Sequence, residues 1–322
     1  MRTIATGLWM ALLLVGTAAC EDSKGDKDTA TDFDVTPDPS ADETAGDPPS
    51  DPAPDETVGD PPSDPTTDET PVDVPGEEVP PGTDMGRDVS IIYLHHSTGG
   101  VIWDGGVPGW VSDYNSANDK GYAIEEWAYP SDSGYGWANY PYDYWNIWIN
   151  HAGPEPYLTE ATLEMLTLDY DVIVFKHCFP VSGIEEDTGS PDIASDVKSI
   201  ENYTLQYEAL KEKLRSFPDH RFIVWTGAAL TAASTTTDQA DRARQFFEWV
   251  KNDWDEPGDN IFVWDFFELE TEGGNVLLDE NAAAPDDSHP GGEFAAFAAP
   301  LFGQRLVNVI QGLGDSTSLT GQ

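Results

Sequence analysis

Five short apolar runs, separated by longer mixed segments, constrain the fold of this chain. They are rich in β-branched and aromatic residues, the composition of strands buried on both faces of a parallel sheet. The runs lie at 89–95, 122–128, 171–177, 221–226 and 261–265. Helical patterns fall at 156–167, 195–216, 237–254 and 291–312. This alternation predicts an α/β fold, a three-layer α/β/α sandwich built on a five-stranded parallel sheet.

The first run ends abruptly in polar residues. Leu94 is followed by His95, His96, Ser97 and Thr98 and then by two glycines. Ligands bind at the carboxyl ends of strands in open α/β sheets, because the loops diverge there. On a tight turn, the Ser97 hydroxyl would face this crevice and its backbone N–H could hold an oxyanion. This stretch alone is equally compatible with a strand that ends in a polar loop.

A second polar stretch near the end of the chain reads Asp-Asp-Ser-His-Pro over residues 286–290. An Asp-x-x-His pair made of Asp286 and His289 lets one short turn supply both a base and the carboxylate that orients it. Asp287 is the rival for the carboxylate.

Ser97 after the first strand and Asp286 with His289 before the last helix resemble the SGNH (GDSL-like) hydrolase superfamily. The resemblance covers roughly residues 88–312. It implies a flavodoxin-like strand order 2-1-3-4-5 and a catalytic triad of Ser97, His289 and Asp286. The chain reads His-His-Ser-Thr-Gly where well-known members read Gly-Asp-Ser, and it has no Gly-x-Asn-Asp block.

The resemblance also implies two more oxyanion donors besides the Ser97 N–H. One should follow the second strand, where Gly134 and Gly136 are candidates and Gly134 is our choice. The other should follow the third strand, where His177 stands in place of the usual asparagine. A buried structural role for His177 is equally compatible with the sequence.

Two further histidines and a cysteine lie close to these positions. His95 and His96 should point to opposite faces of their strand, and one of them is expected to hold the Ser97 loop through a hydrogen bond. A metal site could combine one of them with His177 and a carboxylate, but no compact ligand spacing is present. We therefore predict no metal and no cofactor. Cys178 is expected to be a small buried residue rather than a nucleophile.

Aromatic residues crowd the segment 127–151, which also contains two prolines. We expect a long ordered loop in which Trp137, Tyr142 and Trp145 bind substrate, because aromatic faces beside amides and carboxylates suit sugar rings. The alternative is that these rings pack on the sheet.

The first 20 residues are typical of a bacterial lipoprotein signal. An apolar stretch is followed by Gly16-Thr17-Ala18-Ala19 and by Cys20, which would be the lipidated residue. Ordinary secretion with cleavage near Ala19 is the alternative. We expect a protein of the bacterial cell envelope, anchored to the outer membrane or cell surface, or else secreted.

Residues 21–87 are predicted to be a disordered linker, because their acidic, proline-rich near-repeat lacks the apolar residues that a core needs. We expect the domain to span 88–312 and a flexible tail to follow at 313–322. The formal net charge is -45, which argues against nucleic acid or an anionic membrane surface as a partner. Membrane contact is expected only through Cys20, and the protein is expected to be a monomer.

These features together predict a serine esterase that removes O-acyl, in particular O-acetyl, groups from a carbohydrate or a related ester. Two alternatives stay open. The first is a catalytically silent carbohydrate-binding lipoprotein of the cell surface, and the second is a metal-dependent hydrolase that uses the strand-end histidines.

Overall fold

The computed structural model describes residues 82–131, 134–136 and 138–322. The predicted signal, Cys20, the linker up to residue 81 and Trp137 lie outside this part of the chain. Within the described ranges, no helix is long and apolar enough to cross a membrane.

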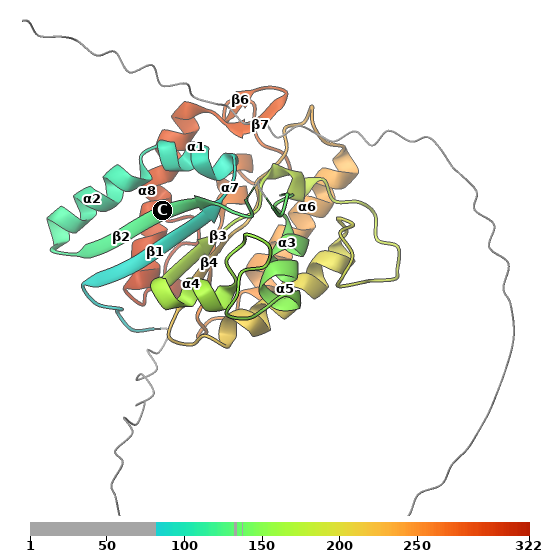
Figure 1. Cartoon of the computed structure of the whole chain (residues 1–322). Coiled ribbons are helices and arrows are strands. Elements are labelled where there is room, and N and C mark those ends of the chain that lie inside the picture. Colours follow the sequence, from blue (N-terminus) through green and yellow to red (C-terminus); the bar gives the residue numbers. More distant parts are fainter. Residues whose placement is uncertain (1–81, 132–133, 137) are drawn as a thin grey trace, which may run out of the picture. The chain divides into compact units, whose positions relative to one another are not determined.

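The centre of the fold is a parallel sheet of five strands in the order β2-β1-β3-β4-β5 (Figure 1). The strands are β1 (Asp88–His95), β2 (Gly121–Ala128), β3 (Val172–Phe175), β4 (Arg221–Trp225) and β5 (Ile261–Trp264). β3, β4 and β5 are buried along their whole length, as expected for strands covered on both faces. The predicted fold class is confirmed, and the strand order is the one that the resemblance implies.

Helices cover both faces of this sheet and give three layers. On one face lie α1 (Thr98–Asp104), α2 (Val107–Asn118) and α8 (Gly292–Ile310), and their apolar side chains pack with Ile91 and Tyr93 of β1. On the other face lie α3 (Pro141–Trp145), α4 (Leu163–Asp169), α5 (Ile200–Arg215) and α6 (Thr237–Trp249), around Ile92 and Leu94. α7 (Phe266–Thr271) follows β5, and a small hairpin of β6 (Ala282–Ala284) and β7 (Asp287–Pro290) precedes α8.

The helix pattern differs from the prediction in several places, and α2 and α7 lie where no helix was predicted. The helix expected at 156–167 begins only at Leu163, since residues 157–160 close an isolated bridge instead. The aromatic segment, expected to be a loop, forms α3 and a π-helix at Asn146–Asn150. α1 was not predicted because it contains two glycines. Gly99 is needed there, since a Cβ at this position would lie 2.4 Å from the Cβ of His95.

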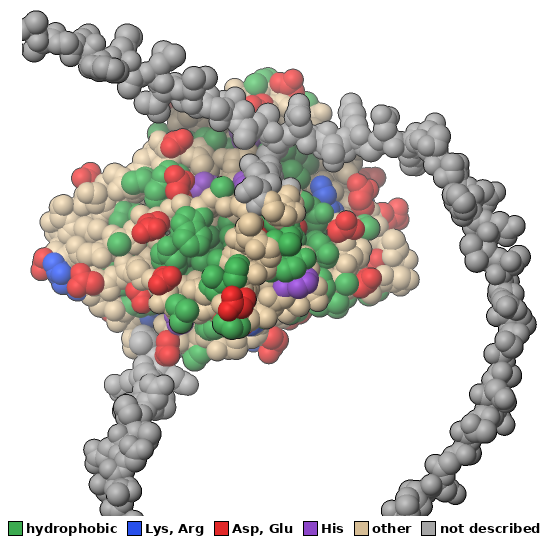
Figure 2. All heavy atoms as spheres, in the orientation of Figure 1, with side chains coloured by type: hydrophobic (Ala, Val, Ile, Leu, Met, Phe, Trp, Pro, Cys, Tyr) green, Lys and Arg blue, Asp and Glu red, His purple; other side chains and the backbone are tan. Residues whose placement is uncertain are grey.

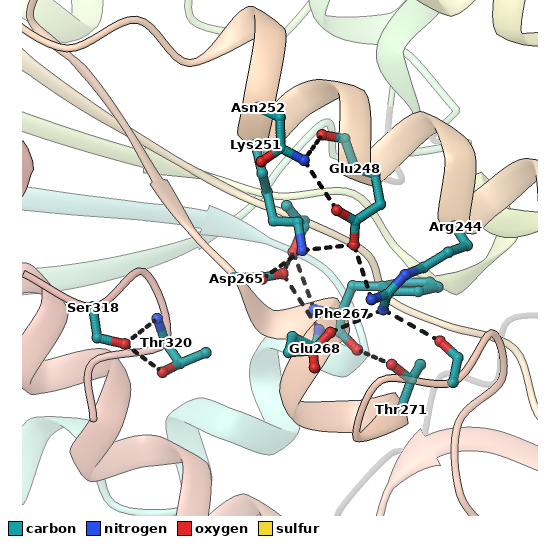
Figure 3. Close-up of polar contacts among 12 residues, drawn as sticks. Arg244, Glu248, Lys251, Asn252, Asp265, Phe267, Glu268, Thr271, Ser318 and Thr320 are labelled. Carbon is teal, nitrogen blue, oxygen red and sulfur yellow. Dashed lines mark hydrogen bonds and ion pairs between the residues drawn. The ribbon is translucent and has the colours of Figure 1, made fainter.

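An ion-pair network ties α6 to α7 and to the end of β5 (Figure 3). Lys251 follows α6 and places its Nζ 2.9 Å from Asp265 Oδ2, and both side chains are nearly buried. Arg244 reaches Glu268 of α7 at 2.9 Å. Asp265 also accepts a hydrogen bond from the Thr226 hydroxyl at 2.7 Å. The network therefore fixes the carboxyl ends of β4 and β5 relative to each other.

The last ten residues, which we expected to be a flexible tail, pack on the domain. The Asp265 N–H donates to the carbonyl of Leu319 at 2.9 Å, and the Trp264 indole donates to that of Thr320 at 3.0 Å. Buried Arg305 donates to the carbonyl of Gly314 at 2.6 Å. A buried guanidinium needs acceptors, and the tail supplies them. This part of the prediction was wrong.

The amino-terminal boundary of the domain also lies earlier than residue 88. The Met85 N–H donates to the carbonyl of Ile310 at 2.9 Å, and Arg221 donates to the carbonyl of Thr83. Arg221 is almost entirely buried, and this burial lowers the pKa of its guanidinium to about 10. Residues 83–87 therefore belong to the folded unit.

We predict that a fragment of residues 76–322 melts at the same temperature as the full chain, whereas a fragment of residues 88–322 melts about 5 °C lower. The shorter fragment leaves Arg221 without one acceptor, at a cost of about 2 kcal/mol. Thermal unfolding followed by circular dichroism measures the difference. If the two fragments have the same melting temperature, the domain begins at residue 88 as the sequence analysis predicted.

Candidate active site

Ser97 lies at the turn between β1 and α1, in a backbone conformation that few residues other than glycine adopt. Its φ is 43° and its ψ is −96°. Such strained positions cost about 1–3 kcal/mol, and they cluster at functional sites. The Ser97 hydroxyl is hydrogen-bonded to Nε2 of His289, although the two residues are 192 positions apart in the sequence. The turn thus presents a hydroxyl to an imidazole.

The imidazole comes from β7, the second strand of the hairpin that precedes α8. Figure 1 shows this hairpin beside α1, which brings His289 to the Ser97 turn. The Thr231 N–H donates to Ser288 Oγ at 3.0 Å and anchors β7 to the loop after β4. The Phe179 and His289 rings lie 5.1 Å apart, edge to face. The base candidate is therefore held from two sides.

The carboxylate that contacts His289 belongs to Asp287 and not to Asp286. Asp287 Oδ1 lies 2.6 Å from His289 Nδ1 and also accepts the His289 N–H at 3.0 Å. Burial raises the pKa of the Asp287 carboxyl, but the two bonds to His289 outweigh it and lower the pKa overall. The sequence prediction of Asp286 assumed a turn. In a strand, side chains two residues apart share a face, so Asp287 pairs with His289.

The arrangement Asp287–His289–Ser97 can activate a hydroxyl. Nε2 accepts the serine proton while Nδ1 stays hydrogen-bonded to the carboxylate. The His289 side chain is 22% exposed and the Asp287 side chain is 45% exposed, so the site is open to solvent.

We predict that Asp287→Asn slows the reaction of Ser97 with a fluorophosphonate by about 10³-fold, because the amide cannot stabilise an imidazolium. The matched variant Asp286→Asn should react within about threefold of the wild-type rate, since its neighbour holds the ring. Both rates are measured by quenching the reaction with a fluorescent fluorophosphonate at a series of times. If only the Asp286→Asn variant labels slowly, Asp286 and not Asp287 is the carboxylate that orients His289.

His95 and His96 both make hydrogen bonds within the fold around the Ser97 turn. His95 Nε2 lies 2.7 Å from the Glu126 carboxylate, and burial lowers the pKa of the His95 ring despite that partner. His96 Nε2 contacts the carbonyl of Pro130. We expected one of the two to hold the loop, and the structure gives such a contact to each.

The two other predicted oxyanion donors occupy different surroundings. His177 is fully buried, with Nε2 2.8 Å from the Tyr207 hydroxyl, and burial lowers its pKa to about 3. These contacts are those of the structural alternative. Gly134 has a φ of +105°, and a Cβ there would meet the Thr159 hydroxyl at 2.7 Å. That contact explains the glycine, and its part in an oxyanion hole stays a prediction.

The predicted substrate-binding aromatics divide between surface and core. Trp145 is 7% exposed, which agrees with the alternative that these rings pack inward rather than with an assignment to substrate. Tyr142 is half-buried, with its ring 5.7 Å from that of Trp145. Trp127, which begins the aromatic segment but was not assigned to substrate, is 39% exposed on β2. The sequence feature that could have predicted this exposure is the position of Trp127 on an edge strand, one side of which has no neighbouring strand.

The described residues contain no group of three or more His, Cys, Asp or Glu side chains that could hold a metal ion. The strand-end histidines are instead engaged with Glu126, Pro130 and Tyr207. Cys178 is buried, as we expected.

No protein-family model matches the chain, and no curated protein is similar to it. Two of the solved structures that match do so over 66% of the chain. An acetyl xylan esterase, AlAXEase, is 13% identical, with 96% of its own length covered and a TM-score of 0.39. A gut microbial diltiazem-metabolizing enzyme, BT4096, is 10% identical, with 46% of its length covered and a TM-score of 0.38. At scores this low, neither similarity bears on the activity of this chain.

Proposed function

We propose that this protein is an ester hydrolase whose nucleophile is Ser97. The observation that carries the proposal is the continuous hydrogen-bonded series from Ser97 Oγ through His289 to Asp287. Three residue types that suit nucleophilic catalysis meet at the carboxyl edge of a parallel sheet, where ligands of such folds bind. The strained backbone of Ser97 adds a second, independent mark of a functional position.

The chemistry follows from the contacts. Ser97 Oγ attacks the ester carbonyl while His289 Nε2 takes the hydroxyl proton, and a tetrahedral oxyanion forms. Asp287 stabilises the resulting imidazolium through Nδ1. When the intermediate collapses, His289 returns the proton to the leaving alkoxide and an acyl-enzyme remains. A water molecule then repeats both steps, giving the carboxylic acid and restoring the serine.

We predict that Ser97→Ala and His289→Ala each lower the turnover of a short aryl ester by about 10⁴-fold, and that the double variant is little worse than either. The residues act as one unit, so their effects should not add. Melting temperatures should change little, because both side chains line an open site. Steady-state kinetics of the full chain measures these losses.

Three outcomes would contradict this proposal. Wild-type turnover by the Ser97→Ala variant would exclude the nucleophile. A wild-type protein that neither hydrolyses esters nor reacts with a fluorophosphonate would instead favour the silent carbohydrate-binding alternative. Loss of ester turnover on chelation would favour the metal-dependent one.

We further propose that the acyl group, in particular an acetyl group, is carried by a carbohydrate. Exposed aromatic rings stack on sugar faces, and Trp127 is exposed on β2, the neighbour of the strand that leads to Ser97, with its ring edge-on to that of Tyr170. Trp127 pairs with Leu94 in the register of the sheet, three residues before the nucleophile, which is about 10 Å along the strand. Figure 2 shows acidic side chains scattered over one face of the molecule and few basic ones, which suits an uncharged substrate better than an anionic one.

We predict that Trp127→Ala and Tyr142→Ala lower kcat/KM about tenfold on an acetylated polysaccharide and leave an aryl ester unaffected. A stacking contact serves only the part of the substrate that extends from the acyl group. Trp145→Ala is the control, because removal of a buried indole should lower the melting temperature. Equal losses on both substrates would assign Trp127 and Tyr142 to the framework instead.

A further inference from the structure

A buried lysine contacts the turn that carries Ser97. Lys176 directly follows β3, the middle strand of the sheet, and its side chain is completely buried. Its Nζ donates a hydrogen bond to the carbonyl of His96 at 3.1 Å. Burying an ammonium group is costly, so this contact needs a reason beyond packing. None of the steps above uses it.

The His96 carbonyl belongs to the same peptide group as the Ser97 N–H. It accepts a second hydrogen bond, from the Gly99 N–H at 2.8 Å. In a planar trans peptide, the C=O and N–H bonds point in opposite directions. Two donors that hold the oxygen towards the protein therefore direct the Ser97 N–H away from them. That N–H is the oxyanion donor available on the nucleophile itself.

The positive charge of the lysine also polarises this peptide group. A charged donor on a carbonyl polarises the whole amide group and makes its N–H a stronger donor. A second buried ionisable group lies nearby, the fully buried carboxyl of Glu270, which accepts the Ala229 N–H at 2.7 Å. Burial raises the pKa of Glu270 strongly, and the charge of Lys176 opposes that rise, so the two groups lie within electrostatic reach.

We propose that Lys176 is a positioning residue of the active site: by holding the His96 carbonyl, it aims and strengthens the Ser97 N–H for the oxyanion. This inference rests on the proposed function. The lysine does not touch the reacting atoms, and it acts through one peptide group.

The test compares Lys176→Met with the wild-type full chain on a short aryl ester. We expect kcat to fall by about 10–100-fold with KM within about twofold, because the contact matters where the oxyanion develops. The affinity for an aryl boronic acid, which forms a tetrahedral anion on serine, should fall by the same factor as kcat. Lys176→Arg should keep kcat within about threefold, since it retains a charged donor.

Lys211→Met is the matched control. Lys211 lies on α5 and is also buried, but its Nζ pairs with the Glu256 carboxylate at 2.9 Å, not with the Ser97 turn. It should lower the melting temperature without changing kcat or boronate affinity. If Lys176→Met does not fold, the double variant Lys176→Met/Glu270→Gln removes both buried ionisable groups and should show the same loss in kcat.

An unchanged kcat and boronate affinity in a folded Lys176 variant would overturn the inference, as would a change confined to KM. Either result leaves the proposed function intact if Ser97→Ala is still inactive. A protein whose ester turnover does not depend on Ser97 would overturn the proposed function itself.

Discussion

All five strands of this sheet run in the same direction, so their carboxyl ends meet at a single edge. The position of β1 between β2 and β3 then decides what surrounds the Ser97 turn. Pro130 reaches it from the segment after β2, and Lys176 reaches it from the end of β3. His289 reaches the turn from β7 because α8 packs close against α1. At this contact residue 105 must be glycine, since a Cβ there would lie 2.5 Å from the Ala295 carbonyl oxygen. Parallel topology thus gathers residues that the sequence keeps far apart.

The polar groups beneath the turn form a support that an apolar core could not provide. A strained φ persists only where the surroundings determine it. Here the preceding histidines are hydrogen-bonded to Glu126 and to Pro130, and the carbonyl of His96 has two donors. Each buried partner is costly to desolvate unless its bond is made, so the bonds hold one arrangement in preference to others. The nucleophile is positioned by these contacts rather than by its own conformational preference.

Sequence patterns predicted the strands well, because short β-branched runs have few other uses in a soluble domain. They also brought Ser97 and His289 forward as partners. The choice between two adjacent aspartates could not be made in advance, since it depends on whether residues 286–289 form a turn or a strand. Lys176 ended an apolar run and resembled an ordinary strand end. Its burial depends on the neighbouring strands and helices, which no local pattern contains. The packing of the tail could not be predicted for the same reason, because its carbonyls accept hydrogen bonds from Trp264 and Asp265, which are far away in the sequence.

The chain enters this domain at the edge of the sheet opposite to the nucleophile. Met85 lies against the end of α8 and Thr83 against the start of β4, whereas Ser97 follows the far end of β1. The eight residues of β1 separate the two edges by about 25 Å. The first described residues therefore lie at the edge of the sheet that is remote from the Ser97 turn. Residues 83–87 consequently leave the Ser97 turn uncovered, because their contacts are made at the other edge of the sheet.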